Sequence, residues 1–241
     1  MKSYFPDILG LLKVSSGNLL EIGSGEGDFL IYASKNSEFK VQGYDVFEHA
    51  GLDPNRKTRV KNKLRDAGLD TQNYIWLSKK ESLPFKHGTF DTIVSIQTLE
   101  HIENIERVFT EIYALLKPGG FALHYFPSAE ILIDPHSGVP LAHKFPTKRK
   151  VILSFFSSLG FGKFKLYANK HNYSKNEFVK EFDNYLTNKC FYRNLSCYMK
   201  ISEKIGLNSW YSPPPPLKNF PFLTKFISLF TSIYMFQKKP H

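Results

Sequence analysis

The chain has 241 residues, which is enough for one large domain or for a domain that carries an insertion. Hydrophobic residues make up 42% and charged residues 22%, as is ordinary for a soluble globular protein. Two cysteines, Cys190 and Cys197, are too few for a disulfide framework and fit a reducing compartment. No signal peptide is predicted, and no stretch reaches the roughly 18 uninterrupted apolar residues of a membrane span. These features predict a cytoplasmic protein.

The net charge of the chain is +10. A basic chain suits an anionic partner, such as nucleic acid, acidic lipid or a phosphorylated substrate. A solvated basic surface without a specific partner accounts for the same charge. Charge alone therefore leaves the choice between these alternatives open.

Apolar runs and helical patterns alternate along the first half of the chain. Strands are predicted at 18–23, 40–46, 74–78, 89–97 and 121–127, and helices at 27–36 and 103–116. The sequence KPGG at 117–120 is expected to end the second of these helices. This alternation predicts an α/β fold with a parallel sheet and helices on both faces. A ligand is expected at the carboxyl ends of the strands.

A glycine-rich loop follows the first predicted strand, with the sequence Gly23-Ser24-Gly25-Glu26-Gly27. Bare backbone at the start of a helix can contact a nucleotide, and no Gly-Lys-Ser/Thr follows to make it a P-loop. Asp45 ends the second strand, where a carboxylate can accept hydrogen bonds from ribose hydroxyls. A tight turn without a ligand explains the glycines as well, and a turn or a helix cap explains Asp45. Nicotinamide dinucleotide and S-adenosylmethionine both fit at this point.

The segments LLEIGSGEGDF, YDV, LPFKHGTFDTIVSIQTLEHI and LLKPGGFALHYFP together resemble the class I S-adenosylmethionine-dependent methyltransferases. The similarity covers residues 18–127 and is greatest for the branch that acts on small molecules, lipids and sugars. It implies a Rossmann-like, seven-stranded, mostly parallel sheet. The sixth strand is then expected at 161–168, and an antiparallel seventh strand at 232–239.

The resemblance also implies S-adenosylmethionine as cofactor and assigns residues to its parts. The methionine part is expected against the first-strand end and glycine loop, at Glu21, Gly23, Ser24, Gly25 and Gly27. Asp45, with Val46, would hold the ribose, and Ile96 and Gln97 would border the methionine chain. The family often places an acid after the third strand for the adenine amino group. Here Ser78 is the nearest acceptor, so the adenine contact departs from the pattern.

The segment 128–150 follows the fifth strand at the edge where the methyl acceptor is expected. Asp134, His136 and His143 are the richest cluster of titratable groups in the chain, and the loop resembles those of surface-polysaccharide methyltransferases. A histidine here could remove a proton from the acceptor, with His143 slightly favoured. A surface loop with incidental histidines is the alternative, and no metal site is expected from this spacing. His101 matches a histidine of the family and is expected to pack or to anchor a loop, with a direct role in methyl transfer as the alternative.

The predicted core comprises residues 1–169 and 231–241, and a mainly helical insertion before the last strand comprises residues 170–230. Ser174 and Glu177 form a capping-box pattern, so a helix is expected to begin there. The apolar segment 220–230 is expected to be a buried helix of an acceptor lid. The alternative is a helix on an acidic membrane surface.

These features together predict methyl transfer from S-adenosylmethionine to a small molecule, in particular a hydroxyl of a sugar or glycolipid precursor for surface polysaccharide. The protein is expected in the cytoplasm, with peripheral contact to the inner membrane face left open. A nucleic-acid (RNA) methyltransferase is the less favoured enzymatic alternative, because no Asn/Asp-Pro-Pro-Tyr/Phe motif for a flipped base is present. A catalytically silent scaffold that binds the cofactor is the third alternative.

Overall fold

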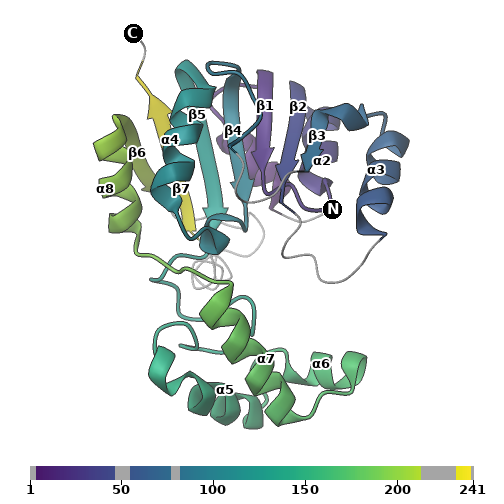
Figure 1. Cartoon of the computed structure of the whole chain (residues 1–241), viewed down its shortest axis with the longest axis vertical. Helices are drawn as coiled ribbons and strands as arrows, with labels where there is room; N and C mark the ends of the chain where they lie inside the picture. The colour runs from purple at the N-terminus through teal and green to yellow at the C-terminus, as the bar shows by residue number, and fades with distance from the viewer. Residues whose placement is uncertain (1–3, 47–54, 77–81, 213–231, 240–241) are drawn as a thin grey trace.

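The computed structural model describes residues 4–46, 55–76, 82–212 and 232–239 (Figure 1). Its strands are β1 (Ser16–Ile22), β2 (Glu38–Asp45), β3 (Tyr74–Trp76), β4 (Phe90–Ile96), β5 (Leu116–Phe126), β6 (Leu207–Ser212) and β7 (Ser232–Lys238). Its helices are α1 (Phe5–Leu11), α2 (Asp28–Asn36), α3 (Arg56–Asp66), α4 (Ile105–Leu115), α5 (Arg149–Ser158), α6 (Phe164–His171), α7 (Lys175–Asn188) and α8 (Leu195–Ile205). None of the described helices has the length and apolar character needed to cross a membrane.

The seven strands form one sheet in the order β3-β2-β1-β4-β5-β7-β6. Strands β1 to β5 pair in parallel, and β7 is antiparallel to both β5 and β6. This confirms the Rossmann-like, seven-stranded, mostly parallel sheet. The predicted last strand at 232–239 is confirmed as β7, which pairs along β5 from Phe121↔Gln237 to Phe126↔Ser232.

The predicted sixth strand at 161–168 is wrong, because helix α6 (Phe164–His171) occupies most of that segment. Phe164 and Tyr167 are three residues apart, and both rings contact Phe178 of α7, at centroid distances of 5.6 and 6.0 Å. Residues at this spacing share a face of a helix, whereas in a strand they would point to opposite sides. The sixth strand is instead Leu207–Ser212.

Helices cover both faces of the sheet, as predicted. One apolar core joins the sheet to α1, α2 and α3, with Ile8, Phe29 and Leu64 almost fully buried. The other joins the opposite face to α4 and α8, with Phe109 and Tyr198 fully buried. Helix α4 ends at Leu115, two residues before the KPGG sequence that was expected to stop it, and this sequence belongs to β5, which begins earlier than predicted.

Helices α5, α6 and α7 form a separate helical unit around their own apolar cluster, which includes Val139, Leu153, Phe178, Phe182 and Leu186. Figure 1 shows this unit below the edge of the sheet where β4 and β5 end. The predicted boundary between 169 and 170 falls inside α6, and β6, which lies within the predicted insertion, belongs to the sheet. The segment 220–230, predicted to be a lid helix, lies outside the described residues.

Candidate functional site

The glycine loop connects β1 to α2 and is held against the end of β2. All three glycines adopt positive φ, at +74° for Gly23, +52° for Gly25 and +71° for Gly27. The backbone N–H of Gly23 donates to the carbonyl of Tyr44 at 2.8 Å. The N–H of Gly25 donates to Oδ2 of Asp45 at 2.7 Å. The two motifs that the sequence analysis linked therefore lie in direct contact.

The three glycines are required for different reasons. A Cβ at Gly23 would lie 2.2 Å from Oγ1 of Thr98, and one at Gly27 would lie 2.8 Å from Cδ2 of Leu64. These two positions are closed by the protein's own packing. Among the described residues, nothing lies nearer than 3.9 Å to a Cβ placed at Gly25. Gly25 is thus the position where bare backbone borders open space, as a ligand that approaches the loop requires.

Helix α3 fastens the loop from the side, which the sequence analysis did not predict. Nε of Arg56 lies 2.7 Å and Nη2 of Arg59 lies 3.3 Å from Oε1 of Glu26. The ammonium group of Lys63 donates to the backbone carbonyl of Glu26 at 3.1 Å. A loop held by β2 and by α3 is preorganised, so less conformational entropy is lost when a ligand binds.

The other predicted cofactor residues lie along the same edge of the sheet, except for Ser78, which is outside the described residues. Glu21 lies one residue before the end of β1 and is 3% exposed, and the partly buried Val46 follows Asp45. A carboxylate at the end of β2 beside bare loop backbone fits a nucleoside with ribose hydroxyls. The glycine loop and Asp45 therefore form a cradle that fits the ribose of a nucleoside such as S-adenosylmethionine, and the assignment of single residues to the parts of this cofactor stays a prediction.

Gln97 follows β4 with a φ of +53°, a left-handed conformation that is rare for a residue with a side chain. Its backbone N–H donates to the carbonyl of Tyr125 at 2.7 Å. Backbone strain of this kind costs about 1–3 kcal/mol and is concentrated at binding and catalytic sites. Ile96 precedes it and is 8% exposed. The ring of Tyr4, before α1, stacks on Tyr125 at 4.9 Å, so the N-terminal segment also reaches this edge.

Asp134 lies at the centre of a second polar cluster, formed by the loop after β5. Its side chain is 0% exposed and accepts hydrogen bonds from the Tyr192 hydroxyl and from the backbone and side chain of Ser137, each at 2.6 Å. Burial by itself would raise the pKa of this carboxyl group. The hydrogen bonds from His136, Ser137 and Tyr192 outweigh burial and lower the pKa of Asp134 to about 2. Asp134 is therefore a fixed, ionised group.

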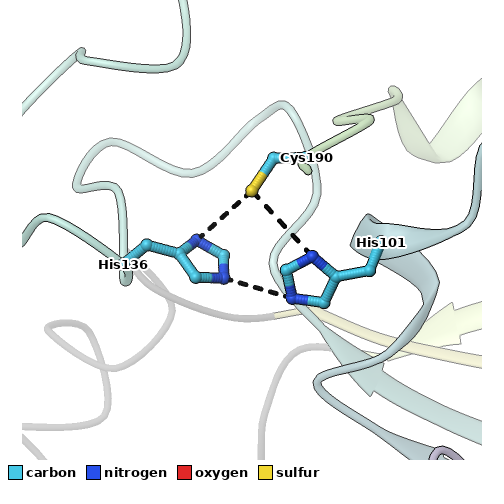
Figure 2. A group of neighbouring side chains, drawn as sticks. All are labelled: His101, His136 and Cys190. Atoms are coloured by element: carbon cyan, nitrogen blue, oxygen red, sulfur yellow. Dashed lines mark hydrogen bonds between the residues drawn. The ribbon is translucent and has the colours of Figure 1, made fainter. Parts of the chain in front are cut away.

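His136 joins this cluster to the segment after β4. Its Nδ1 lies 2.8 Å from the Tyr192 hydroxyl and 3.4 Å from Oδ1 of Asp134. Its Nε2 lies 3.4 Å from Nε2 of His101. Figure 2 shows the two rings facing each other beside the thiol of Cys190. The structure thus brings together His101, which was expected to pack or anchor a loop, and two of the predicted catalytic residues.

His143 also packs against the Tyr192 ring and is less exposed than His136. It is 8% exposed, and its ring centroid is 4.8 Å from that of Tyr192. Burial lowers the pKa of His143 below its ordinary value, which keeps the ring neutral and able to accept a proton. The catalytic assignment of Asp134, His136 and His143 stays a prediction.

Glu100, Cys190 and Tyr192 are the members of this region that sequence reasoning missed. Glu100 is fully buried, and burial, with the negative charge of Asp134 nearby, raises its pKa to about 8. Its position directly before His101 was a usable signal. Cys190 and Tyr192 lie more than 50 residues beyond Asp134 in the sequence, so no local pattern connects them.

Known proteins resemble this chain in both sequence and fold. The family described as "Methyltransferase domain" matches residues 2–163, which is more than half of the chain. The chain belongs to this family. A solved S-adenosylmethionine-dependent methyltransferase from Mesorhizobium loti has the same fold, with a TM-score of 0.61 and 16% identity over 98% of both chains. S-adenosylmethionine is accordingly the cofactor of this chain, and its contact with the glycine loop and Asp45 stays a prediction.

Curated relatives match about half of this chain. The 24-methylenesterol C-methyltransferase 2 of Oryza sativa subsp. japonica is 29% identical over 119 residues, which is 49% of this chain and 31% of the relative. The mitochondrial arginine-hydroxylase NDUFAF5 of Mus musculus is 33% identical over 123 residues, which is 51% of this chain and 32% of the relative. The matched segment thus spans about a third of each relative.

Proposed function

We propose that the chain transfers a methyl group from S-adenosylmethionine to a hydroxyl of a small molecule, in particular a sugar or a glycolipid precursor. The cofactor would supply an electrophilic methyl group on its sulfonium. The observation that carries the proposal is the placement of Asp134 and His136 beside the segment that follows β4, at the edge where the glycine loop also lies. Relatives that are named as methylenesterol methyltransferases support a small-molecule acceptor.

The polar character of this region favours a hydroxyl acceptor. A hydroxyl attacks the methyl group well only as it loses its proton, so a base within hydrogen-bond reach assists the reaction. His136 has the arrangement of an oriented base, because Asp134 and Tyr192 hold its Nδ1. Tyr185 lies with its ring centroid 5.2 Å from that of His136, and aromatic rings suit the apolar faces of sugars.

A methyl-transfer screen tests the proposed function. The chain would be incubated with S-adenosylmethionine and panels of nucleotide sugars, lipid-linked sugars and RNA, and S-adenosylhomocysteine formation would be measured. Turnover with a sugar-containing acceptor, and a product heavier by one methylene unit, supports the proposal. Turnover with RNA alone would favour the nucleic-acid alternative. Cofactor binding without turnover on any panel would favour a silent scaffold.

The same assay identifies the base, once an acceptor is known. We expect His136→Ala or His143→Ala to lower the rate of methyl transfer by about 10²–10⁴-fold, the usual contribution of a general base. Affinity for S-adenosylhomocysteine should stay within about twofold, because neither ring belongs to the glycine-loop cradle. His87→Ala is the matched control, since His87 precedes β4 at the opposite end of that strand. Near-normal turnover in both test variants would place the base elsewhere.

A further inference from the structure

Two histidines from distant parts of the chain meet ring edge to ring edge. His101 ends a short 3-10 helix, Leu99–His101, just after β4, and His136 lies in the loop after β5. Their Nε2 atoms are 3.4 Å apart (Figure 2). Their side chains are 13% and 16% exposed, so the pair lies below the surface but within reach of solvent.

The hydrogen-bond network determines which ring nitrogens carry protons. Nδ1 of His101 lies 2.6 Å from the carbonyl oxygen of Lys189, which only accepts, so this Nδ1 carries the hydrogen. The Tyr192 hydroxyl donates to Asp134, so its oxygen accepts from Nδ1 of His136. A neutral imidazole has one N–H, and both Nε2 atoms therefore present lone pairs to each other. Two facing lone pairs are compatible only with a cation between them.

The distance of 3.4 Å between the two Nε2 atoms fits a shared metal ion better than a shared proton. A hydrogen bond between an imidazolium and an imidazole nitrogen is about 2.7–3.2 Å long. Two histidine nitrogens bound at about 2.0–2.1 Å to one tetrahedral Zn²⁺ ion lie about 3.4 Å apart. The observed separation of 3.4 Å matches the metal-bound arrangement. The Nδ1–H contacts to a carbonyl and to the Asp134–Tyr192 pair are those that orient metal-binding histidines.

Two further donors lie beside the pair. One ligand atom each from His101, His136 and Cys190 lies within 4.8 Å of the other two. Sγ of Cys190 lies 3.9 and 4.0 Å from the two Nδ1 atoms, on the side of the rings away from the Nε2 pair (Figure 2), so it joins an ion held by the Nε2 atoms only after rotation about its Cα–Cβ bond. Oε1 of Glu100 is 3.8 Å from Nε2 of His101. Neither carboxylate oxygen of Glu100 has a hydrogen-bond partner among the described residues, although the side chain is 0% exposed. A buried carboxyl group in this state is costly unless a cation compensates it.

We propose that His101, His136 and Cys190 bind a divalent transition-metal ion, with Glu100 as the fourth ligand. Four donors of the nitrogen, thiolate and carboxylate types favour a tetrahedral Zn²⁺ ion. The ion cross-links the segment after β4, the loop after β5 and the segment after α7, and so fastens the helical unit to the sheet. With an ion on its Nε2, His136 cannot accept a proton there, so His143 is then the general base of the two candidates, and the rate loss expected for His136→Ala comes from loss of the ion. The metal site does not rest on the proposed methyl transfer.

Metal content and cobalt spectra of the untagged full chain test this site. We expect about one equivalent of zinc per chain after purification without chelator, because thiolate and imidazole donors bind this ion tightly. After replacement by Co²⁺, a thiolate-to-cobalt charge-transfer band should appear. Cys190→Ser should abolish this band, and the matched control Cys197→Ser, in α8, should keep it.

Affinity measurements complete the test without relying on one variant. His136→Gln and Glu100→Gln should each weaken Co²⁺ binding by roughly tenfold or more, while circular dichroism shows that the fold is kept. Absence of bound zinc together with absence of a thiolate band in the wild-type chain would overturn the proposal and leave a protonated histidine pair. A band that survives Cys190→Ser would overturn the assignment of Cys190. None of these readouts requires an acceptor or methyl transfer.

Discussion

The side chain of Asp45 holds the glycine loop and is expected to bind the ribose of the cofactor as well. Its Oδ2 accepts the N–H of Gly25 at 2.7 Å, and its place at the end of β2 suits ribose hydroxyls. Hydrogen bonds to a charged group contribute about 1.5–3 kcal/mol, so Asp45→Ala should weaken S-adenosylhomocysteine binding by roughly 10- to 150-fold. Calorimetry measures this affinity, with Asp66→Ala, at the exposed end of α3, as control. Equal affinities for the wild type and Asp45→Ala would remove Asp45 from the site.

Two glycines of the same loop are expected to have different roles, Gly25 in ligand binding and Gly27 in folding. At Gly25 an added Cβ stays at least 3.9 Å from every other described atom that it would face, whereas at Gly27 it lies 2.8 Å from Leu64. We expect Gly25→Ala to fold, with the positive φ costing about 1–2 kcal/mol, and to lose cofactor affinity. Gly27→Ala should destabilise the chain further, because overpacking adds about 1–3 kcal/mol to the same backbone cost.

Chemical unfolding and cofactor titration of the two glycine variants check this expectation. For each variant, the loss in the free energy of unfolding is compared with the loss in affinity for S-adenosylhomocysteine. A Gly25→Ala chain that binds S-adenosylhomocysteine as tightly as the wild type would show that the ligand does not approach this backbone. A Gly27→Ala chain as stable as the wild type would show that Leu64 moves aside at no cost.

Helix α7 is the element whose start the sequence predicted best. Ser174 Oγ accepts the Glu177 N–H at 3.3 Å, and the Glu177 side chain accepts the Ser174 N–H at 2.8 Å, which is the predicted capping box. Ser174→Ala should cost about 1 kcal/mol. For a chain of this size the melting temperature should fall by about 2–4 °C. Ser174→Thr keeps the hydroxyl and should stay close to the wild type. A Thr variant as unstable as the Ala variant would contradict a capping role.

Stability of the whole molecule should depend on pH through His124. This residue of β5 is 0% exposed, and burial lowers its pKa to about 3 from an ordinary value of 6.5. Because the unfolded chain binds a proton that the folded chain excludes, the stabilising difference is complete above pH 6.5. It is lost by about 1.4 kcal/mol per pH unit as pH falls from about 6.5 towards 3.

Urea unfolding at pH 7 and pH 5 measures this dependence. The wild type should lose about 2 kcal/mol between these values through His124. His124→Gln keeps a polar group near Ser95, whose Oγ lies 2.7 Å from Nδ1, and removes this titration. The variant should therefore show a flatter profile. An unchanged difference between pH 7 and pH 5 in the variant would assign the pH dependence to other groups.

The sequence by itself determined strands β1 to β5, strand β7 and the position of the glycine loop beside Asp45. Alternating apolar runs and helical patterns specify β1 to β5 and their helices, because buried parallel strands and amphipathic helices have local periodicities. The glycine loop and Asp45 were also predictable, since each sits directly after its strand, and parallel strands end at one edge. The structure confirms that they touch, through Gly25 and Asp45.

Only the tertiary structure decided the second half of the molecule. Residues 161–168 could read as a strand, but packing of Phe164 and Tyr167 on α7 makes them helical, and β6 forms further along, where β7 offers an edge. The cluster of His101, His136 and Cys190 joins segments 35 to 89 residues apart in sequence. Contacts at such separations are set by how the helical unit folds back on the sheet, which no local periodicity encodes.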